Sequence, residues 1–325
     1  SNIANIGFIG AGNYASRVLI PGFKSSGANL HTIVSSGGVS SSQQGNKFGF
    51  LKSSSDIDSV MNDNEVNTLV IATRHDSHAN LASRGLLSGK NIFVEKPLAL
   101  DIKGLEMVED AYRTHDGIVN RPRLMVGFNR RFSPHIIKMM ELLKDRCEPI
   151  SVIMTINSGY IAPDHWLQNR ETGGGRIIGE ACHFVDLMRY IVGYKIQSVS
   201  AFSMGDLVQA NWGEDKASIT LTFEDGSVGT IHYFANGANS FPKERVEVFS
   251  NSRILQIDNY RKMKGYGFKV FNKFNLWRQD KGQVACARIF SDCIKRGDPS
   301  PIPADQIFEV SRAVIEAVQQ IRDRA

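Results

Sequence analysis

Short apolar strands alternate with helix-like segments over the first part of the chain. A parallel sheet with crossover helices requires this alternation, so this part of the sequence predicts a doubly wound α/β fold of the Rossmann type. The predicted strands cover residues 3–9, 30–35, 68–73, 91–94 and 124–128, and the predicted helices cover residues 14–23, 42–48, 55–62, 77–88 and 100–115.

The pattern of apolar and polar positions changes beyond residue 129. Longer strands with alternating apolar and polar positions are separated there by turn residues. Glu224-Asp225-Gly226 has the composition of a hairpin turn. This part therefore predicts an α+β domain with an open, largely antiparallel sheet. Its predicted strands cover residues 150–157, 199–204, 217–223, 227–233 and 245–249, and late helices at 284–295 and 304–322 are separated by a turn at 297–301.

The length of 325 residues suits two domains better than one, since domains cluster around ~100–200 residues. The change of rhythm places the predicted Rossmann domain at residues 1–122 and the α+β domain at residues 123–325. The sequence shows no internal repeat.

The composition is ordinary for a globular protein, with 42% hydrophobic and 22% charged residues. The net charge of +5 is small and the basic residues are scattered, which argues against a nucleic-acid partner. It leaves at most a weak preference for anionic small molecules. No apolar run approaches the ~20 residues that span a bilayer, and no secretory signal is visible, so we expect no membrane partner.

The chain has four cysteines, Cys147, Cys182, Cys286 and Cys293. They show neither metal-ligand spacing nor the density of a disulfide framework, which points to a reducing cytoplasm. His75 and His78 lie three residues apart, but His165 and His183 are distant in sequence and no cysteine pair joins them. We therefore expect no metal site.

A glycine-rich loop, Gly10-Ala11-Gly12-Asn13-Tyr14-Ala15, lies where the first predicted strand gives way to a helix. A dinucleotide-binding fingerprint needs this context. Gly10 permits the tight turn, Gly12 lets the backbone approach a pyrophosphate, and the helix N-terminus offers unpaired N–H groups to the anion. A purely structural glycine turn is the alternative. The context favours nucleotide binding through Gly10, Gly12, Asn13 and Tyr14.

The end of the second predicted strand bears on which dinucleotide binds. An acidic residue there normally bonds the adenosine ribose of NAD, whereas a nearby arginine accommodates the phosphate of NADP. The strand ends in Val34-Ser35-Ser36-Gly37-Gly38, which contains neither marker. No carboxylate repels a 2′-phosphate and the hydroxyls of Ser35 and Ser36 can bond it, so NAD or NADP is expected, with NADP slightly favoured.

Glu95-Lys96-Pro97 follows directly on the predicted strand 91–94, at the carboxyl end of the parallel sheet, where ligands bind. A lysine at this place can set its ammonium beside a substrate hydroxyl. Pro97 fixes the turn, since its ring restricts Lys96 to extended conformations. A solvated surface lysine is the commoner fate, but the strand-end position favours a functional one.

The segment from Gly173 to Asp186 reads as a glycine turn followed by a helix, with apolar positions at helical spacing. Glu180 and His183 are three residues apart, which makes them neighbours on a helix surface. A carboxylate can then tune an imidazole, the side chain that titrates near neutrality. The alternative is a core histidine beside a solvated glutamate.

These motifs resemble the glucose-fructose oxidoreductase / inositol dehydrogenase (Gfo/Idh/MocA-type) family of NAD(P)-dependent enzymes, over nearly all of the chain. The resemblance rests on Gly10-x-Gly12-x-x-Ala15, Ala72-Thr73 leading to His78, Glu95-Lys96-Pro97, the segment 127–134 (GFNRRFSP), and Gly173-Gly174-Gly175 leading to His183 and Asp186.

The resemblance implies a Rossmann domain followed by a substrate domain whose open sheet covers the nicotinamide and builds a homo-oligomer, either a dimer or a tetramer. It implies that Lys96 orients the substrate and shares its proton, that His183 is the acid/base, and that Asn129 contacts the substrate. Along the cofactor it places Thr73, Arg74, His75, His78 and Glu95.

One departure from the family pattern concerns the predicted helix that carries His183, called the acid/base helix below. The family usually carries an aspartate four residues before the histidine, and this chain has Gly179 there. On a helix of 3.6 residues per turn, Glu180 lies ~100° around from Gly179 but only ~60° from His183. A carboxylate still lies beside the imidazole, so Glu180 is a candidate third catalytic residue. A second difference is Arg74, where many relatives have proline.

Residues 159–166, with the later 173–186 segment, are most similar to one subgroup of the family. In that subgroup the module is fused behind a zinc-type alcohol dehydrogenase-like domain, in proteins associated with bacterial surface polysaccharides. The likeness shifts the expected substrate toward a sugar or sugar nucleotide. Arg170 and Arg176 are candidates to pair with a phosphate or carboxylate, and Tyr160 and Trp166 to stack on a sugar ring. Surface solubility and core packing are the respective alternatives.

The leading hypothesis is an NAD(P)-dependent oxidoreductase that moves a hydride between the nicotinamide and a hydroxyl-bearing carbon of a sugar, nucleotide sugar or cyclitol. His183, or Lys96 with it, removes the hydroxyl proton, and such help typically contributes ~10²–10⁴-fold. The alternative is a non-catalytic regulatory protein that senses a dinucleotide or sugar on the same fold. Glycine at position 179 supports that alternative, whereas retention of Lys96 and His183 opposes it.

Overall fold

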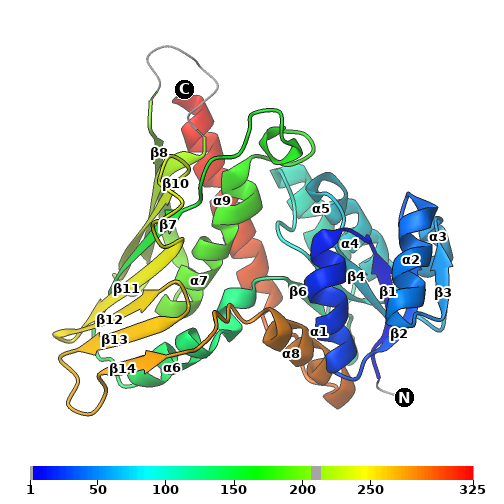
Figure 1. The fold of residues 1–325 in the computed structure, drawn as a ribbon, viewed down its shortest axis with the longest axis horizontal. Helices are drawn as coiled ribbons and strands as arrows, with labels where there is room; N and C mark the ends of the chain where they lie inside the picture. The colour runs from blue at the N-terminus through cyan, green and yellow to red at the C-terminus, as the bar shows by residue number, and fades with distance from the viewer. Residues whose placement is uncertain (1–2, 206–213, 325) are drawn as a thin grey trace. The chain divides into compact units, whose positions relative to one another are not determined.

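The computed structural model describes residues 3–205 and 214–324, and the chain divides into two compact units (Figure 1). The first unit consists of Ser1–Phe128 and Gln283–Phe308, and the second of Asn129–Gly282 and Glu309–Ala325. The predicted boundary after residue 122 differs from this division in two ways. Residues 123–128 continue the first unit, and a late stretch of the chain returns to it.

The first unit is built on a parallel sheet with the strand order β3-β2-β1-β4-β5-β6 among the described residues. The order reverses between β1 and β4, which is the switch point of a doubly wound sheet. The predicted α/β fold is confirmed. The strands are β1 (Asn5–Ile9), β2 (Asn29–Val34), β3 (Lys52–Ser54), β4 (Thr68–Ile71), β5 (Asn91–Val94) and β6 (Leu124–Val126).

Helices connect these strands, and a ring cluster explains why the late helix α8 belongs to this unit. Phe93 on β5 packs edge-to-face on Phe23 of α1 at 5.2 Å between ring centroids, and Phe290 of α8 lies 5.6 Å from Phe93. The helical segments are η1 (Ala15–Leu19, a π-helical turn), α1 (Ile20–Ser25), α2 (Gly38–Phe48), α3 (Ile57–Met61), η2 (His75–Ser77), α4 (His78–Leu87), α5 (Ile102–Arg113) and α8 (Gln283–Arg296).

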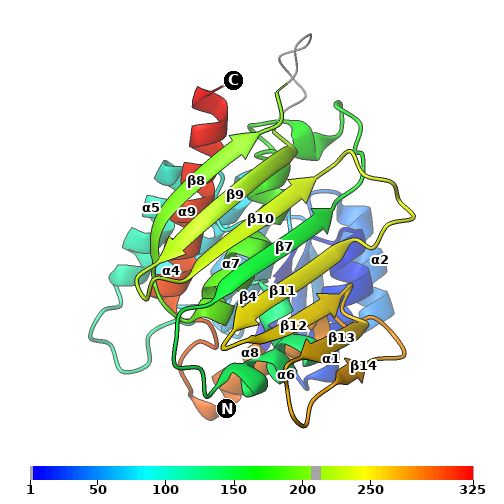
Figure 2. The same cartoon turned by 90° about the vertical axis from the view of Figure 1, so that its left-hand side faces the viewer.

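The second unit is built on a sheet with the order β14-β13-β12-β11-β7-β10-β9-β8, seen face-on in Figure 2. β7 and β10 pair in parallel and the other neighbours are antiparallel, so the predicted open, largely antiparallel sheet is confirmed. The strands are β7 (Ser151–Asn157), β8 (Ile196–Ser203), β9 (Lys216–Phe223), β10 (Val228–Phe234), β11 (Glu244–Ser250), β12 (Arg253–Asp258), β13 (Lys262–Tyr266) and β14 (Lys273–Asn275).

One face of this sheet forms the core of the second unit. Side chains along β7, β9, β10 and β11 alternate between buried and partly exposed, as a sheet covered on one face requires. Helix α7 approaches β10 closely because Gly229 has no side chain, and a Cβ there would lie 2.3 Å from the Met188 sulfur. The helical segments are η3 (Asn129–Phe132), α6 (Pro134–Leu143), η4 (Trp166–Gln168), η5 (Ile177–Ala181, a second π-helical turn), α7 (Cys182–Val192) and α9 (Ala304–Asp323).

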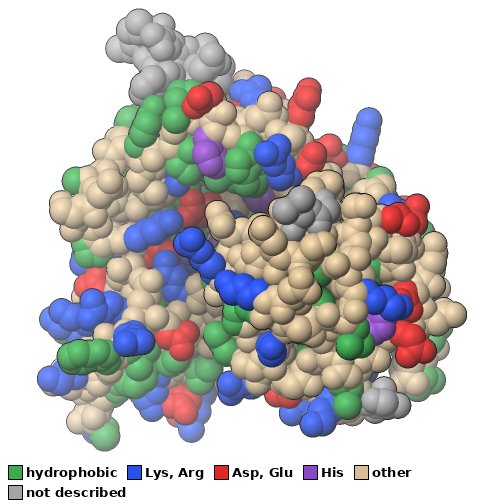
Figure 3. All heavy atoms as spheres, turned by 45° about the vertical axis from the view of Figure 1, so that its right-hand side comes forward, with side chains coloured by type: hydrophobic (Ala, Val, Ile, Leu, Met, Phe, Trp, Pro, Cys, Tyr) green, Lys and Arg blue, Asp and Glu red, His purple; other side chains and the backbone are tan. Residues whose placement is uncertain are grey.

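The surface of the described residues can be compared with the expectation that basic residues are scattered. On the face shown in Figure 3, Lys and Arg side chains form separate groups among neutral surface and acidic side chains. Within residues 3–205 and 214–324, no helix is long and apolar enough to cross a membrane.

Candidate functional site

The loop after β1 has the backbone geometry of a phosphate cradle. Gly10 has a φ of 108°, and a Cβ there would lie 2.4 Å from the Ala72 carbonyl oxygen, so only glycine fits. Its amide donates to the Val34 carbonyl at 2.8 Å, which fixes the loop against β2. Gly12 differs, because a Cβ there would meet no described atom within 4 Å. The protein backbone requires Gly10, whereas the surface at Gly12 stays open for a ligand.

The other predicted residues of the loop and of the β2 end are accessible. Asn13 and Tyr14 are exposed at the start of the helix that contains η1. Ser35 is half-buried and its hydroxyl lies 3.5 Å from the Gly37 carbonyl, while Ser36 is exposed. The end of β2 is the position that normally bonds the adenosine ribose of a dinucleotide. Segment 34–38 has two serine hydroxyls at this position and no carboxylate.

The turn after β4 contains one residue that supports the site and does not face a ligand. His78 is fully buried, with Nδ1 2.8 Å from the Pro97 carbonyl and Nε2 3.2 Å from the Thr73 carbonyl. Burial lowers the pKa of His78. The imidazole therefore ties the turn after β4 to the turn after β5. A direct contact of His78 with a cofactor, as the resemblance implied, does not fit this interior position.

The remaining residues of that turn differ in how far they are exposed. Thr73 Oγ1 lies 2.6 Å from Ser77 Oγ, and both residues are half-buried. Arg74 is exposed, whereas His75 is buried with its ring centroid 5.6 Å from that of His78. Thr73 and Arg74 are therefore the members of this group whose positions suit contact with a ligand.

The turn of Glu95, Lys96 and Pro97 is fixed by contacts of Glu95 with β4, with Gly127 and with the Lys96 backbone amide. The Glu95 amide donates to Ile71 of β4 at 2.8 Å, and the Glu95 carboxylate lies against Gly127, where a Cβ would meet Oε1 at 2.6 Å. The Lys96 amide donates to Glu95 Oε2 at 3.3 Å. Lys96 is half-buried, and its ammonium is close enough to contribute to the lowered pKa of His78. A buried carboxylate and a fixed turn thus position the lysine.

In the second unit, a tight glycine turn leads into the helical segment that carries Glu180 and His183. A Cβ on Gly173 would lie 2.5 Å from the Trp166 carbonyl oxygen, and Gly174 and Gly175 have φ values of 77° and 85°. The π-helical turn η5 follows and contains Glu180, and His183 is buried in the first turn of α7. π-Helical turns inside α-helices occur frequently at functional sites. The wider turn also alters the helix angles between Gly179, Glu180 and His183 that a regular α-helix predicts.

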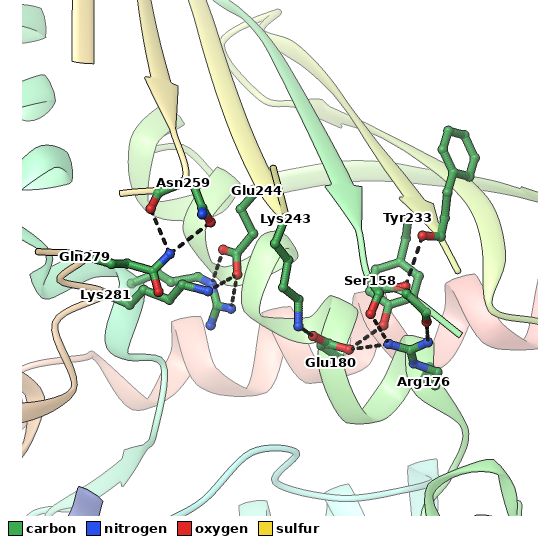
Figure 4. A network of polar contacts seen from close by, with 12 residues as sticks. Ser158, Arg176, Glu180, Tyr233, Lys243, Glu244, Asn259, Gln279 and Lys281 are labelled. Atoms are coloured by element: carbon green, nitrogen blue, oxygen red, sulfur yellow. Dashed lines mark hydrogen bonds and ion pairs between the residues drawn. The ribbon is translucent and has the colours of Figure 1, made fainter. Parts of the chain in front are cut away.

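The carboxylate of Glu180 is the centre of an ion-pair network (Figure 4). Arg176 Nη2 donates to Oε2 at 3.1 Å, and Lys243 Nζ donates to Oε1 at 2.8 Å. The phenol of Tyr233 donates to Oε2 at 2.5 Å. Two cations and a phenol hold this carboxylate, which suits an anchoring role better than proton transfer. The predicted role of Glu180 as acid/base partner of His183 stays a prediction.

A second buried network adjoins the first. Arg130 makes two 2.8 Å hydrogen bonds to the Glu244 carboxylate, and Lys281 Nζ donates to its Oε1 at 2.6 Å. Burial alone would raise the pKa of Glu244, but the two cations lower it to about 2. The side-chain amide of Asn129 donates from Nδ2 to the Lys281 carbonyl at 2.6 Å. Asn129 is buried in this network, so its predicted substrate contact is replaced by a supporting role.

A third buried pair fixes the acid/base helix itself. Arg131 of η3 makes two hydrogen bonds to Asp186 of α7, at 2.8 Å and 2.6 Å. Asp186 lies three residues after His183 and is fully buried. The motif residues Arg131 and Asp186 therefore hold the helix and do not present their charges to a ligand.

The two predicted anion-binding arginines are engaged within the protein. Arg176 is 2% exposed and also donates to the Gly159 and Ser158 carbonyls, at 2.5 Å and 3.1 Å. Arg170 is exposed and donates to Glu214 at 2.6 Å. The prediction for Arg176 does not fit, because the side chain is buried in the fold. Sequence reasoning missed Lys243 and Tyr233, and nothing in their local sequence marks them.

The predicted aromatic residues lie at the start of this region. Tyr160 is exposed in the loop after β7, and Trp166 begins η4 with its ring centroid 5.9 Å from that of His165. Both positions are accessible to a ligand. Within the described ranges, no three His, Cys, Asp or Glu side chains gather as a metal site.

Two family models match this chain. Residues 4–121 match the oxidoreductase family with an NAD-binding Rossmann fold, and residues 148–252 match the GFO/IDH/MocA C-terminal domain. Together the two matched ranges include the glycine loop, the Lys96 turn and the acid/base helix.

Curated relatives and solved structures agree with these matches. The chain is 29% identical over 211 residues to an uncharacterized oxidoreductase, YrbE, of Bacillus subtilis, covering 64% of this chain and 60% of the relative. It is 27% identical over 271 residues to myo-inositol 2-dehydrogenase of Thermotoga maritima, covering 80% of this chain and 78% of that enzyme. The structure of levoglucosan dehydrogenase in complex with NADH and levoglucosan has the same fold, with a TM-score of 0.81, 19% identity and 97% of each chain covered.

Proposed function

Since the chain belongs to the GFO/IDH/MocA oxidoreductase family, we propose that it moves a hydride reversibly between a nicotinamide dinucleotide and a hydroxyl-bearing carbon of a sugar, nucleotide sugar or cyclitol. The observation that carries the proposal is the pair of fixed turns at the carboxyl ends of one parallel sheet. The first is the open glycine loop at Gly12, and the second is the turn that positions Lys96. Ligands of doubly wound sheets bind at this edge.

The glycine loop fits the pyrophosphate of a dinucleotide. Gly12 leaves space for the phosphates, and the following helix offers its N-terminal amides. Ser35 and Ser36 supply hydroxyls for the adenosine ribose, and they place no negative charge against a 2′-phosphate. When bound, the nicotinamide supplies the hydride chemistry.

The side chains of Lys96 and His183 perform the proton transfer that accompanies hydride transfer. His183 takes the hydroxyl proton, because leaving an alkoxide in a dry site is costly. The Lys96 ammonium stabilises the developing negative charge on the oxygen. Glu180 acts indirectly, since its carboxylate is held by Arg176 and Lys243 and fixes the start of the helix that carries His183.

A substrate screen tests the proposal. The purified chain is incubated with NAD⁺ or NADP⁺ and a panel of aldoses, cyclitols, anhydrosugars and nucleotide sugars, and reduced cofactor is followed by its absorbance. We expect at least one of these classes to be oxidised. Intact binding of NADH together with no turnover across the panel would contradict the proposal and favour a sensor on the same fold.

The open face of the second-unit sheet supports a further element of the proposal, a homo-oligomer. Val228 and Phe249 are partly exposed apolar residues on this face, and Phe234 and Ile153 lie on neighbouring strands with the same orientation. Apolar side chains exposed on a sheet face gain free energy when a second copy covers them. Light scattering measures the mass, and a monomer at all protein concentrations contradicts this element.

A further inference from the structure

The two ion-pair networks of the second unit follow one another through consecutive residues of the chain. The first part consists of Arg176, Glu180 and Lys243 (Figure 4). The second part consists of Lys281, Glu244 and Arg130. Lys243 and Glu244 are consecutive residues, so the two parts adjoin. We call these six side chains the charge row. It contains four cations and two carboxylates, and therefore two more positive than negative charges.

Lys243 is the member of the charge row that reaches solvent. Its side chain is 43% exposed, whereas the side chains of Arg176, Arg130 and Lys281 are 2%, 7% and 14% exposed. An ammonium has three N–H donors. One of them is committed to Glu180 at 2.8 Å. The exposed side of Lys243 therefore presents positive charge and donors at the surface of the row.

The position of Lys243 relative to the acid/base helix is fixed. Its carbonyl accepts a hydrogen bond from the Asn157 amide at 2.8 Å, which ties the start of β11 to the end of β7. Its ammonium is held by Glu180, which lies three residues before His183 in the same helical segment. A ligand group that contacts Lys243 is therefore bound next to the segment that carries Glu180 and, three residues later, His183.

Neutralisation of Glu180 does not by itself account for Lys243. Arg176 is buried and already pairs with this carboxylate, and Tyr233 adds a third donor. A second cation on one carboxylate leaves excess positive charge, which a hydrogen-bonded anion balances favourably. The buried cations add to this field, because low-dielectric surroundings screen them less than water does.

We propose that Lys243 binds an anionic group of the substrate, a carboxylate or a phosphate, and that Glu180 is the positioning residue that holds the lysine there. This inference rests on the proposed function and narrows its substrate class to charged sugars. Sugar acids and sugar phosphates share the required chemistry.

A binding experiment tests the inference without requiring turnover. Calorimetry compares glucose, glucuronate and glucose 6-phosphate on the NADH-loaded chain. We expect at least one anionic probe to bind about tenfold more tightly than glucose, with the advantage decreasing as salt increases. Stronger binding of glucuronate identifies a carboxylate site, and stronger binding of glucose 6-phosphate identifies a phosphate site.

Three variants complete the design. Lys243→Gln should remove the advantage of the anionic probe over glucose, and Lys243→Arg should restore most of it. Lys262→Gln, at an exposed lysine on β13, is the matched control. Equal binding of charged and neutral probes, no binding of either anionic probe, or equal losses in the Lys243→Gln and Lys262→Gln variants overturns the inference. Oxidation of neutral sugars in the screen would then still support the proposed function.

Discussion

The phenol of Tyr233 donates a hydrogen bond to the carboxylate of Glu180 across 53 residues of sequence, at 2.5 Å. Burial and the adjacent carboxylate raise the pKa of Tyr233 well above its usual value. The raised pKa favours the protonated phenol, which donates the hydrogen bond to Glu180. This bond fixes the distal end of Glu180, and through it the position of Lys243.

Tyr233→Phe should loosen this arrangement without changing the fold. The variant removes one donor from a partly buried carboxylate, which typically costs about 1–3 kcal/mol of unfolding free energy. We expect a several-fold rise in KM for an anionic substrate and a smaller change in kcat. Urea unfolding and steady-state kinetics measure these effects. Tyr266→Phe, at an exposed position on β13, is the control and should change neither.

Lys96→Ala and His183→Ala test the proposed proton transfer. Each should lower kcat by about 10²–10⁴-fold, the usual contribution of a positioned acid/base group. NADH affinity should change little, because neither side chain belongs to the glycine loop. Fluorescence titration measures the affinity, and Lys103→Ala, an exposed lysine on α5, is the control. Unchanged turnover in either variant removes that residue from the mechanism.

The parts of the molecule that the sequence predicts well are those that local physics determines. Gly10 is required by its φ of 108° and by the Ala72 carbonyl, and the loop signal depends on these local requirements. Helix α6 also carries a local signal, because the Ser133 hydroxyl caps its amide at Ile136 and Pro134 begins it. The elements predicted from the apolar pattern nevertheless do not include this helix.

The charge row could not be predicted in the same way. Arg130 meets Glu244 across 114 residues, and Lys243 meets Glu180 across 63. Both contacts join the start of β11 to helical segments far away in sequence, and no local pattern encodes such pairing. Strands β12, β13 and β14 were missed because charged residues interrupt their apolar positions.

The buried pair of Arg131 and Asp186 predicts a strong asymmetry between single and double variants. Asp186→Leu alone leaves an uncompensated guanidinium in the core and should cost about 3–5 kcal/mol of unfolding free energy. Replacing both residues with apolar ones, Arg131→Met with Asp186→Leu, should recover most of that loss. Urea unfolding of Asp186→Leu, Arg131→Met and the double variant measures the difference. A double variant that is less stable than either single one would show that the ion pair itself is strongly stabilising.

Two buried histidines predict how stability depends on pH. Burial lowers the pKa of His78 and of His135 in the folded state, whereas histidine in an unfolded chain titrates near about 6.5. As the pH falls through about 6.5, the unfolded chain binds protons that the folded chain does not, so the free energy of unfolding decreases. Their stabilising contribution is therefore complete above this pH and is lost below it.

Urea unfolding at several pH values on both sides of neutrality measures this dependence. His135→Gln should lower stability above neutrality and flatten the decrease on the acid side. His165→Gln, at an exposed position, is the matched control. A wild-type protein whose stability stays constant between about pH 7.5 and 5.5 contradicts the assignment of both histidines as neutral buried groups.

The end of β2 predicts which dinucleotide the first unit accepts. Ser35 and Ser36 stand where a carboxylate would select NADH by repelling a 2′-phosphate, so NADPH should bind at least as well as NADH. Ser36→Asp introduces that repulsion and should weaken NADPH binding about tenfold or more, while NADH binding is kept. Ser36→Asn, which has a similar size and no charge, is the control. Fluorescence titration separates the outcomes, and a wild-type chain that binds NADH several-fold more tightly than NADPH rules out the phosphate-tolerant pocket.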